Sequence, residues 1–321
     1  MKTLSSEAQT AVRRAAAKIL GAYTPPQLRH SEELLAGLDA AAARGAAAGE
    51  WAHLAEAIAT ALRTEGADHF LRLRPIAKTV HPRIRSHSAD YLRYVLASRH
   101  CSAQFQRALT ESPVGQPLVN PFYPLSSPLL IQHGYHLIRL LEATELDLAA
   151  LRLVVDFGGG YGSFFRLLRN LGYRDAYRIW DIPVMCALQR FYLRNVFPEG
   201  ASGEPPANLD WLVSGDPEAP HAVGELAAGA SQSLFVATWS LSETPLAVRA
   251  TITPVLEQFS FVLCAYQRSF AGIDNAAYFA ELAARLGQFR WVHAECPVYP
   301  NNFYLIGARN AGRGGRAAVR Q

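Results

Sequence analysis

The sequence has little lysine, and this shortage bears on the partners it can bind. Of 31 basic residues in 321, only Lys2, Lys18 and Lys78 are lysines, and the formal net charge is +4. This excess falls well short of the concentrated basic patch that a nucleic-acid-binding protein usually carries. We therefore expect no nucleic-acid partner.

Cysteine and long apolar runs are also scarce. The four cysteines, Cys101, Cys186, Cys264 and Cys296, are far apart and form no CxxC pair. A disulfide framework or a structural zinc site requires close pairs or a high cysteine density, so we expect reduced thiols and no metal. No stretch approaches the roughly 20 apolar residues that span a bilayer, and charges interrupt the N-terminal segment. We expect a cytoplasmic protein with no membrane partner.

The first 120 residues carry the signals of packed helices. Apolar residues recur there at three- and four-residue spacing, as in Leu54, Ile58 and Leu62. We expect residues 1–120 to form a helical cap that contributes to a substrate site, and a homodimer through these helices is a further expectation. The expected helices cover about residues 5–20, 31 onward, 50–65, 88–109 and 128–143.

Two segments differ in composition from the rest. Residues 111–127 are dense in proline and glycine, which predicts a connecting loop. We therefore place a connecting loop and helix at 121–147 and a second domain at 148–310. The tail, 311–321, is rich in glycine and arginine and is predicted to be disordered.

From Leu151 onward, short apolar runs alternate with amphipathic helices, which predicts βαβ units and a parallel sheet. The last two runs are joined by residues 300–302, a connection too short for a helix, so these two strands must be antiparallel. The sequence thus predicts an α/β, Rossmann-like fold of five parallel β/α units closed by an antiparallel hairpin. The expected strands are 151–156, 176–181, 209–213, 233–238, 259–266, 291–299 and 303–309.

The strongest motif, DFGGGYG at 156–162, follows the first predicted strand and opens a helix. Glycines there allow a tight turn and the close approach of a ligand. Asp156 lies two residues before the first glycine, where the phosphates of a dinucleotide or a triphosphate would meet its charge. S-adenosylmethionine has no phosphate, and a carboxylate at this position favours its positively charged sulfonium and ammonium groups. No P-loop pattern is present, and Ser163 replaces the third glycine of the NAD motif.

Two further carboxylates follow the next two strands. Asp181 ends the second strand, where it can accept hydrogen bonds from both ribose hydroxyls of a nucleoside. Asp216, in GDPE after the third strand, can reach an adenine amino group. The alternative for both residues is a helix N-cap, because each precedes a predicted helix.

These motifs carry a family resemblance. DFGGGYG followed by WDIP, GD and SLSETP resembles the class I S-adenosylmethionine-dependent methyltransferases, whose seven-stranded sheet ends in an antiparallel pair. With GQP and HGYHLIRLLE added, residues 110–309 are similar to the bacterial sugar O-methyltransferase family. The resemblance implies S-adenosylmethionine as cofactor, S-adenosylhomocysteine as product, and cofactor contacts from Asp156, Gly158, Gly159, Gly160, Asp181, Ile182, Asp216, Thr238 and Trp239.

The acceptor side is less defined. The resemblance to plant-type O-methyltransferases implies a base histidine after the fourth strand, but this chain has Glu243 as the nearest ionisable residue there. His133 and His136 are three apart on one predicted helix, so both can face one side of it. We expect Glu243 to orient the acceptor and His133 to be the base for a hydroxyl, with half-buried helix histidines as the alternative. Tyr161, His136 and Ser242 are expected to contact the acceptor.

Three functions remain open at this point. The first is O-methylation of a small-molecule acceptor, a sugar or a secondary metabolite. The second is N-methylation of an amino- or guanidino-bearing small molecule, for which no histidine base is needed. The third is a protein that binds the cofactor without turnover.

Overall fold

The computed structural model describes residues 28–44, 50–80, 87–120, 123–197, 206 and 208–310. The helix expected at about 5–20 and the tail 311–321 lie outside these residues.

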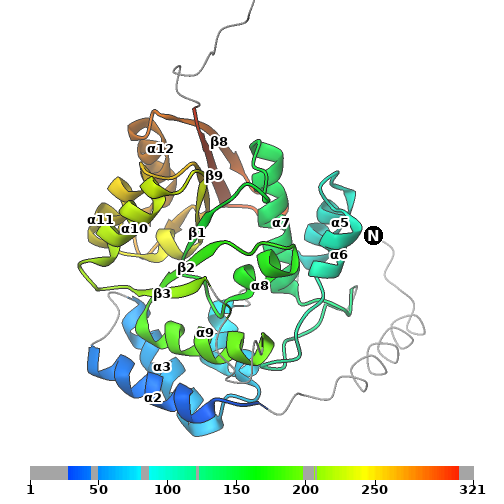
Figure 1. Cartoon of the computed structure of the whole chain (residues 1–321), viewed down its shortest axis with the longest axis vertical. Helices are drawn as coiled ribbons and strands as arrows, with labels where there is room; N and C mark the ends of the chain where they lie inside the picture. The colour runs from blue at the N-terminus through cyan, green and yellow to red at the C-terminus, as the bar shows by residue number, and fades with distance from the viewer. Residues whose placement is uncertain are drawn as a thin grey trace, which may run out of the picture.

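A seven-stranded sheet forms the centre of the fold, in the order β3-β2-β1-β4-β5-β9-β8 (Figure 1). Strands β1 to β5 pair in parallel, and β9 lies antiparallel between β5 and β8. The Rossmann-like prediction of a parallel sheet closed by an antiparallel hairpin is therefore confirmed. The bounds are β1 Leu153–Phe157, β2 Ala176–Asp181, β3 Leu209–Val213, β4 Ser233–Thr238, β5 Phe261–Gln267, β8 Phe289–Glu295 and β9 Asn302–Arg309.

The hairpin region departs from the prediction in two details. Strand β8 ends at Glu295 and not at residue 299, because Pro297 has no N–H to donate to the ladder. A small hairpin of β6 (Ser269–Phe270) and β7 (Ile273–Asp274) was not predicted. Its two turn residues, Ala271 and Gly272, have φ of 48° and 80°, as a tight two-residue hairpin turn requires.

Helices cover both faces of the sheet (Figure 1). One face carries α7 (Pro128–Ala143), α8 (Ser163–Asn170) and α9 (Pro183–Val196). The other carries α10 (Ala219–Gly229), α11 (Leu246–Leu256) and α12 (Asn275–Arg285). The start of α7 is fixed by Ser127, whose Oγ accepts a hydrogen bond from Leu130 N at 3.1 Å, with Pro128 in the first turn.

The N-terminal helices pack against the first of these faces. Helices α2 and α3 contact α9, α5 contacts α7, and α6 contacts α8. The single helix predicted at 88–109 is two, because Ser98 is extended and the Ser102 side chain caps a new helix by accepting from Phe105 N. Helix α4 and the short helix η1 were not predicted. The bounds are α2 Ser31–Arg44, α3 Glu50–Glu65, η1 Phe70–Arg72, α4 Arg74–Val80, α5 Ser88–Ala97 and α6 Ala103–Ala108.

Two hydrophobic clusters flank the sheet. The larger one joins the N-terminal helices to the sheet, since Ile58, Phe70 and Tyr91 belong to the same buried cluster as Leu167 and Tyr192. The second cluster lies beneath α10, α11 and α12. The N-terminal helices and the sheet therefore share one core.

Candidate active site

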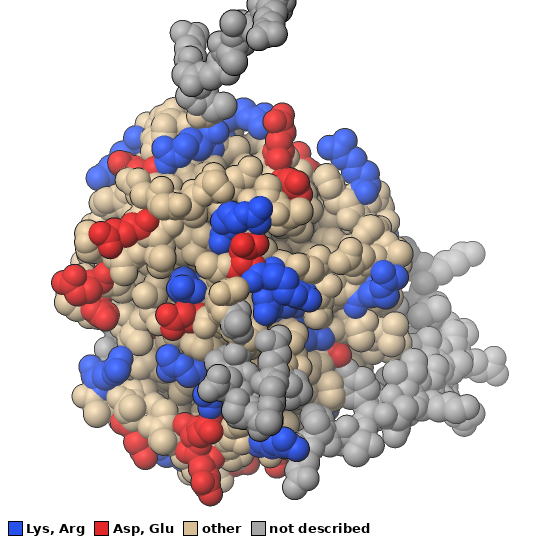
Figure 2. Space-filling view, in the orientation of Figure 1, with Lys and Arg blue, Asp and Glu red and all other residues tan. Residues whose placement is uncertain are grey.

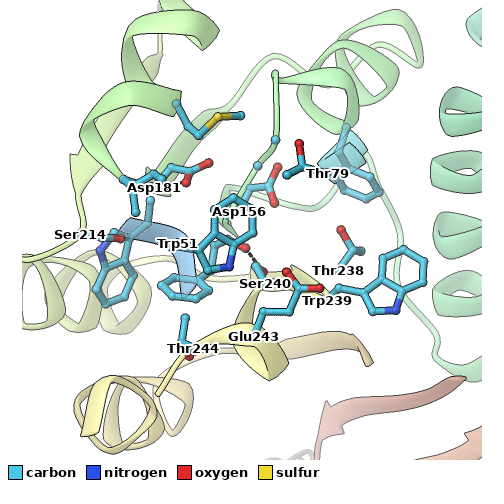
Figure 3. Close-up of a pocket in the computed structure, with 18 of the residues that line it drawn as sticks. Trp51, Thr79, Asp156, Asp181, Ser214, Thr238, Trp239, Ser240, Glu243 and Thr244 are labelled. Atoms are coloured by element: carbon cyan, nitrogen blue, oxygen red, sulfur yellow. Dashed lines mark hydrogen bonds between the residues drawn. The ribbon is translucent and has the colours of Figure 1, made fainter. Parts of the chain in front are cut away.

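A cavity of about 780 Å³ lies at the carboxyl ends of the parallel strands, where the strand order reverses between β1 and β4. Open α/β sheets bind ligands at such a point. Figure 3 shows the cavity with Asp156, Asp181 and Thr238 extending from three of these strands. The predicted site residues that line it are His133, Asp156, Gly158, Gly159, Gly160, Tyr161, Asp181, Ile182, Thr238, Trp239 and Glu243.

The glycine loop shapes one wall of the cavity. Gly158 and Gly160 have φ of +71° and +59°, a region that side-chain-bearing residues rarely adopt. A Cβ on Gly158 would lie 2.2 Å from Cβ of Ser240, so the loop and the turn after β4 are in close contact there. A Cβ on Gly160 would meet nothing within 4 Å, which places this backbone beside open space in the cavity wall.

Asp156 is a buried carboxyl group at the base of the cavity. Its side chain is 2% exposed, and its Oδ2 accepts a 2.7 Å hydrogen bond from the Tyr177 hydroxyl. Burial raises the pKa of Asp156 to about 7, and the hydrogen bond from Tyr177 opposes this rise. A bound cation would stabilise the ionised form that burial disfavours.

Asp181 is held by the start of α9 and by its second turn. Its Oδ1 accepts from Ile182 N at 2.8 Å, and its Oδ2 accepts from Gln189 Nε2 at 2.7 Å. Gln189 also donates to Gly160 O at 2.7 Å, so one amide ties the carboxylate to the glycine loop. Burial raises the pKa of Asp181 to about 7, and the charge of Asp156 adds to the rise.

Glu243 supplies a third carboxyl group, from the short helix η3 (Ser240–Glu243) after β4. Figure 3 shows it below Trp51, which comes from α3 in the N-terminal region. Burial raises the pKa of Glu243 to about 7, opposed by hydrogen bonds from the Gln267 amide and the Trp51 indole. The N-terminal region therefore contributes directly to the cavity wall.

The cavity is unbalanced in charge. Among the described residues that line it there are three carboxyl groups and no lysine or arginine. On the face of the molecule in Figure 2, by contrast, acidic and basic side chains are interspersed. A phosphate-bearing ligand would meet like charge in this cavity without a cationic partner, whereas a cationic ligand would be favoured.

Trp239 lines the cavity in an uncommon backbone conformation. Its φ and ψ are 66° and −30°, which for a bulky residue is a true outlier. The backbone N donates to Ala265 O at 2.6 Å, and the indole Nε1 donates to Asn302 Oδ1 at 2.8 Å. Such conformations persist where the surroundings over-determine them, and they cluster at ligand sites.

Three predicted site residues do not line the cavity. Asp216 is exposed, and its Oδ1 accepts from Glu218 N in the turn that leads into α10, whose N-cap residue is Glu218 and not Asp216. Ser242 is buried, with its hydroxyl donating to Trp239 O and paired with Gln267 Oε1. His136 is buried, with Nδ1 bonded to the Tyr304 hydroxyl at 2.5 Å and its ring 5.3 Å from that of Trp239.

His133 lines the cavity, but the structure does not favour it as the base. Its side chain is buried, and burial lowers its pKa to about 3. An imidazole that resists protonation to this degree is a weak proton acceptor near pH 7, because general bases work best with a pKa near the working pH. The role of His133 as the base stays a prediction, and helical spacing does not reveal the burial that opposes it.

Four contributing residues were missed. Tyr177 and Asp181 both lie on β2 and are four positions apart. Side chains alternate between the two faces of a strand, so these two lie on the same face of the sheet. Gln189 is a buried amide in the α9 sequence, and this polar residue among apolar neighbours was an available signal. Trp51 and Thr79 line the cavity from α3 and α4, and no local pattern marks them.

Two general features of the described residues complete the site. No group of three or more histidine, cysteine, aspartate or glutamate side chains there is arranged to hold a metal ion. None of the helices in the described part of the chain has the length and apolarity to cross a membrane.

Comparisons with known proteins give similarity at the level of solved structures. No protein-family model and no curated protein matches the chain. An O-methyltransferase family protein from Burkholderia thailandensis is similar at 15% identity and a TM-score of 0.38, over 96% of both chains. Human N-acetylserotonin methyltransferase in complex with SAM is similar at 13% identity and a TM-score of 0.34, over 81% of this chain and 66% of that one. The methyltransferase domain of a bacterial CtHen1 gives 10% and 0.40, over 55% and 97%. Similarity at this level carries no argument about ligand or reaction.

Proposed function

We propose that this protein transfers a methyl group from S-adenosylmethionine to a small-molecule acceptor. One observation carries the proposal, namely that the described lining of the cavity holds three carboxyl groups, of which Asp156 and Asp181 are buried and Glu243 is half-buried, and no cationic side chain. When bound, S-adenosylmethionine supplies a methyl group on a positively charged sulfur. A dinucleotide or a nucleoside triphosphate would bring negative charge to carboxylates that burial already disfavours.

The cofactor half of the cavity fits the parts of this molecule. Asp156, beside the glycine loop, would pair with the α-ammonium group, and the left-handed backbone at Gly160 leaves room for the ligand. Asp181, fixed by Gln189, would accept hydrogen bonds from the ribose hydroxyls. Ile182 and Met185 offer an apolar wall for the base.

The acceptor half would be formed by Glu243 and by Trp51 and Thr79 of the N-terminal helices. The volume of about 780 Å³ is in the upper part of the range for ligand pockets, roughly 300–1,000 Å³, so a cofactor and a small acceptor can share it. The chain contributes by holding the two reactants in place and excluding water. Glu243, with a pKa near neutrality, is the residue suited to take a proton.

Ligand-dependent stability tests this proposal. A ligand that binds only the native state raises the melting temperature by mass action. We expect S-adenosylmethionine and S-adenosylhomocysteine to raise it, and NAD and ATP to leave it unchanged at the same concentrations. Stabilisation by NAD or ATP without a response to S-adenosylhomocysteine would overturn the proposal.

Turnover separates an enzyme from a protein that only binds the cofactor. We expect S-adenosylhomocysteine to form when the protein is incubated with S-adenosylmethionine and a metabolite extract, together with a metabolite heavier by one methylene unit in mass spectrometry. The Asp181→Ala variant serves as the control and should form less of both products when S-adenosylmethionine is kept below saturation. Cofactor binding without any product would leave the binding-only function as the correct one.

A further inference from the structure

The Glu243 carboxyl group has neutral partners in the structure. Its Oε1 accepts a long hydrogen bond, 3.4 Å, from Gln267 Nε2, and the Trp51 indole also faces it. Arg249, on the helix that follows, directs its donors to Ser242 O, Thr244 O and Asn275 Oδ1 instead. Glu243 is half-buried, and its partners among the described residues are all neutral, so a cation supplied by a ligand would be favoured here.

Aromatic side chains also line the cavity, and among them Trp51 contacts Glu243 directly. Trp51, Trp239, Phe270 and Tyr299 all line it, and they come from four separate segments of the chain. Glu243 is tied to Trp239 by its own backbone, because Glu243 N donates to Trp239 O at 3.1 Å. Aromatic faces attract ammonium groups through the ring quadrupole, most strongly where water is excluded.

The other two carboxyl groups already have parts of the cofactor to bind. In the proposed function, Asp156 meets the α-ammonium and Asp181 meets the ribose, which leaves Glu243 without a counterpart from the cofactor. An acceptor bearing a carboxylate or a phosphate would add a like charge, with no lysine or arginine among the described lining residues to receive it.

We propose that the acceptor is an amine, bound as its ammonium ion between Glu243 and the aromatic side chains of Trp51 and Trp239. The inference rests on the proposed methyl-transfer function and names its acceptor class. Before alkylation, one N–H bond of the ammonium breaks, the proton forms an O–H bond on the Glu243 carboxylate, and the nitrogen keeps the electron pair. Glu243 thus both recognises the amine and takes its proton.

Matched probe compounds test the inference by calorimetry on the protein saturated with S-adenosylhomocysteine. The probes are phenethylamine and tryptamine, their alcohols phenethyl alcohol and tryptophol, and the acids phenylacetate and indoleacetate. We expect at least one amine to bind at least tenfold more tightly than its alcohol, and the acids not to bind. Alcohols binding as tightly as the amines, or no amine binding, would overturn the inference.

Two variants assign the effect to this site. Glu243→Gln should weaken the amine at least tenfold and leave the alcohol and S-adenosylhomocysteine within threefold, whereas Glu257→Gln, at an exposed glutamate, should change neither. If the Glu243 variant does not fold, Trp51→Leu should still weaken the amine severalfold. An amine affinity unaffected by both variants contradicts the inference. If the unmodified protein does not bind S-adenosylhomocysteine, that result contradicts the proposed function instead. Failure of the amine inference and failure of the proposed function are therefore distinguishable.

Discussion

The Tyr177 hydroxyl donates a 2.7 Å hydrogen bond to Asp156 Oδ2, across two neighbouring strands and beneath the cavity. Both side chains are buried, so the hydroxyl is a built-in donor to a carboxyl group whose pKa burial raises to about 7. This contact keeps Asp156 closer to ionisation at neutral pH than burial alone would allow.

Removing that donor should weaken cofactor binding. In Tyr177→Phe the pKa of Asp156 rises further, so the protonated form dominates at pH 7 and the ammonium group loses its partner. A hydrogen bond to a charged group contributes about 1.5–3 kcal/mol, so we expect at least a tenfold loss of S-adenosylhomocysteine affinity by calorimetry. Tyr173→Phe is the matched control, since its hydroxyl donates to Ala176 O outside the cavity. Equal affinities for the two variants would contradict the role of Tyr177.

Asp181 and Asp216 should differ sharply. Asp181→Ala leaves the ribose hydroxyls without their acceptor and should cost roughly 1.5–3 kcal/mol of cofactor binding, with little effect on the melting temperature. Asp216→Ala changes an exposed residue outside the cavity and should leave the affinity unchanged. Titration of both variants with S-adenosylhomocysteine checks this. If Asp181→Ala keeps its affinity but melts earlier, the side chain serves only the start of α9.

Cofactor affinity should increase with pH through neutrality. Without ligand, Asp156 has a pKa of about 7, so at pH 6 it is about nine-tenths protonated. The ligand's cation stabilises the ionised form and lowers this pKa, so binding releases a proton below pH 7. Affinity therefore rises by up to about tenfold per pH unit for each proton released, and levels off above the pKa of the free protein. Calorimetry at pH 6 in buffers of different ionisation enthalpy measures the release, and Asp156→Asn should reduce it.

Two glycine substitutions should have opposite effects on stability. Gly160→Ala forces an alanine into φ of +59°, which costs about 1–2 kcal/mol, and places a methyl group in the cavity wall. We expect a lower melting temperature and weaker binding of S-adenosylhomocysteine. Gly224→Ala, in α10 with nothing within 4 Å of the new Cβ, should instead stabilise by about 0.5–1 kcal/mol. The melting temperatures of both variants, compared with that of the unmodified protein, test this, and a shift in the same direction for both would contradict it.

His133 should stay neutral throughout the physiological range. Burial lowers its pKa to about 3, so its ring resonances should not shift with pH between 5 and 8 in NMR spectra, with His133→Asn used to assign them. A titration midpoint inside that range would restore His133 as a candidate base.

The sheet could be predicted from the sequence because each of its features has a local cause. The alternation of apolar runs and amphipathic segments defines βαβ units, and the short link at 300–302 permits only an antiparallel pair. The break at Ser98 was missed, because the periodicity of α5 continues into α6 while a single serine cap divides them. Helix α4 was missed too, because seven residues carry little periodicity.

Some residues of the candidate site could likewise be predicted from local sequence, and others could not. Asp156, Asp181 and the glycine loop follow directly from strand ends, since parallel strands bring their carboxyl ends to one edge. Trp51 could not be predicted, because it is nearly two hundred residues away from Glu243 in sequence. Its contact with Glu243 depends on how α3 packs against α9. The low pKa of His133 depends in the same way on burial by segments that are distant in the chain.

The shared core limits how ligands can enter and leave. If the N-terminal helices swung away as one body, Ile58, Leu62 and Phe70 would be exposed to water, at a cost of about 1.5–3 kcal/mol each. Such an opening would be too rare to serve a catalytic cycle. In the proposed function, ligands would therefore enter and leave the cavity while the layers of the fold stay together.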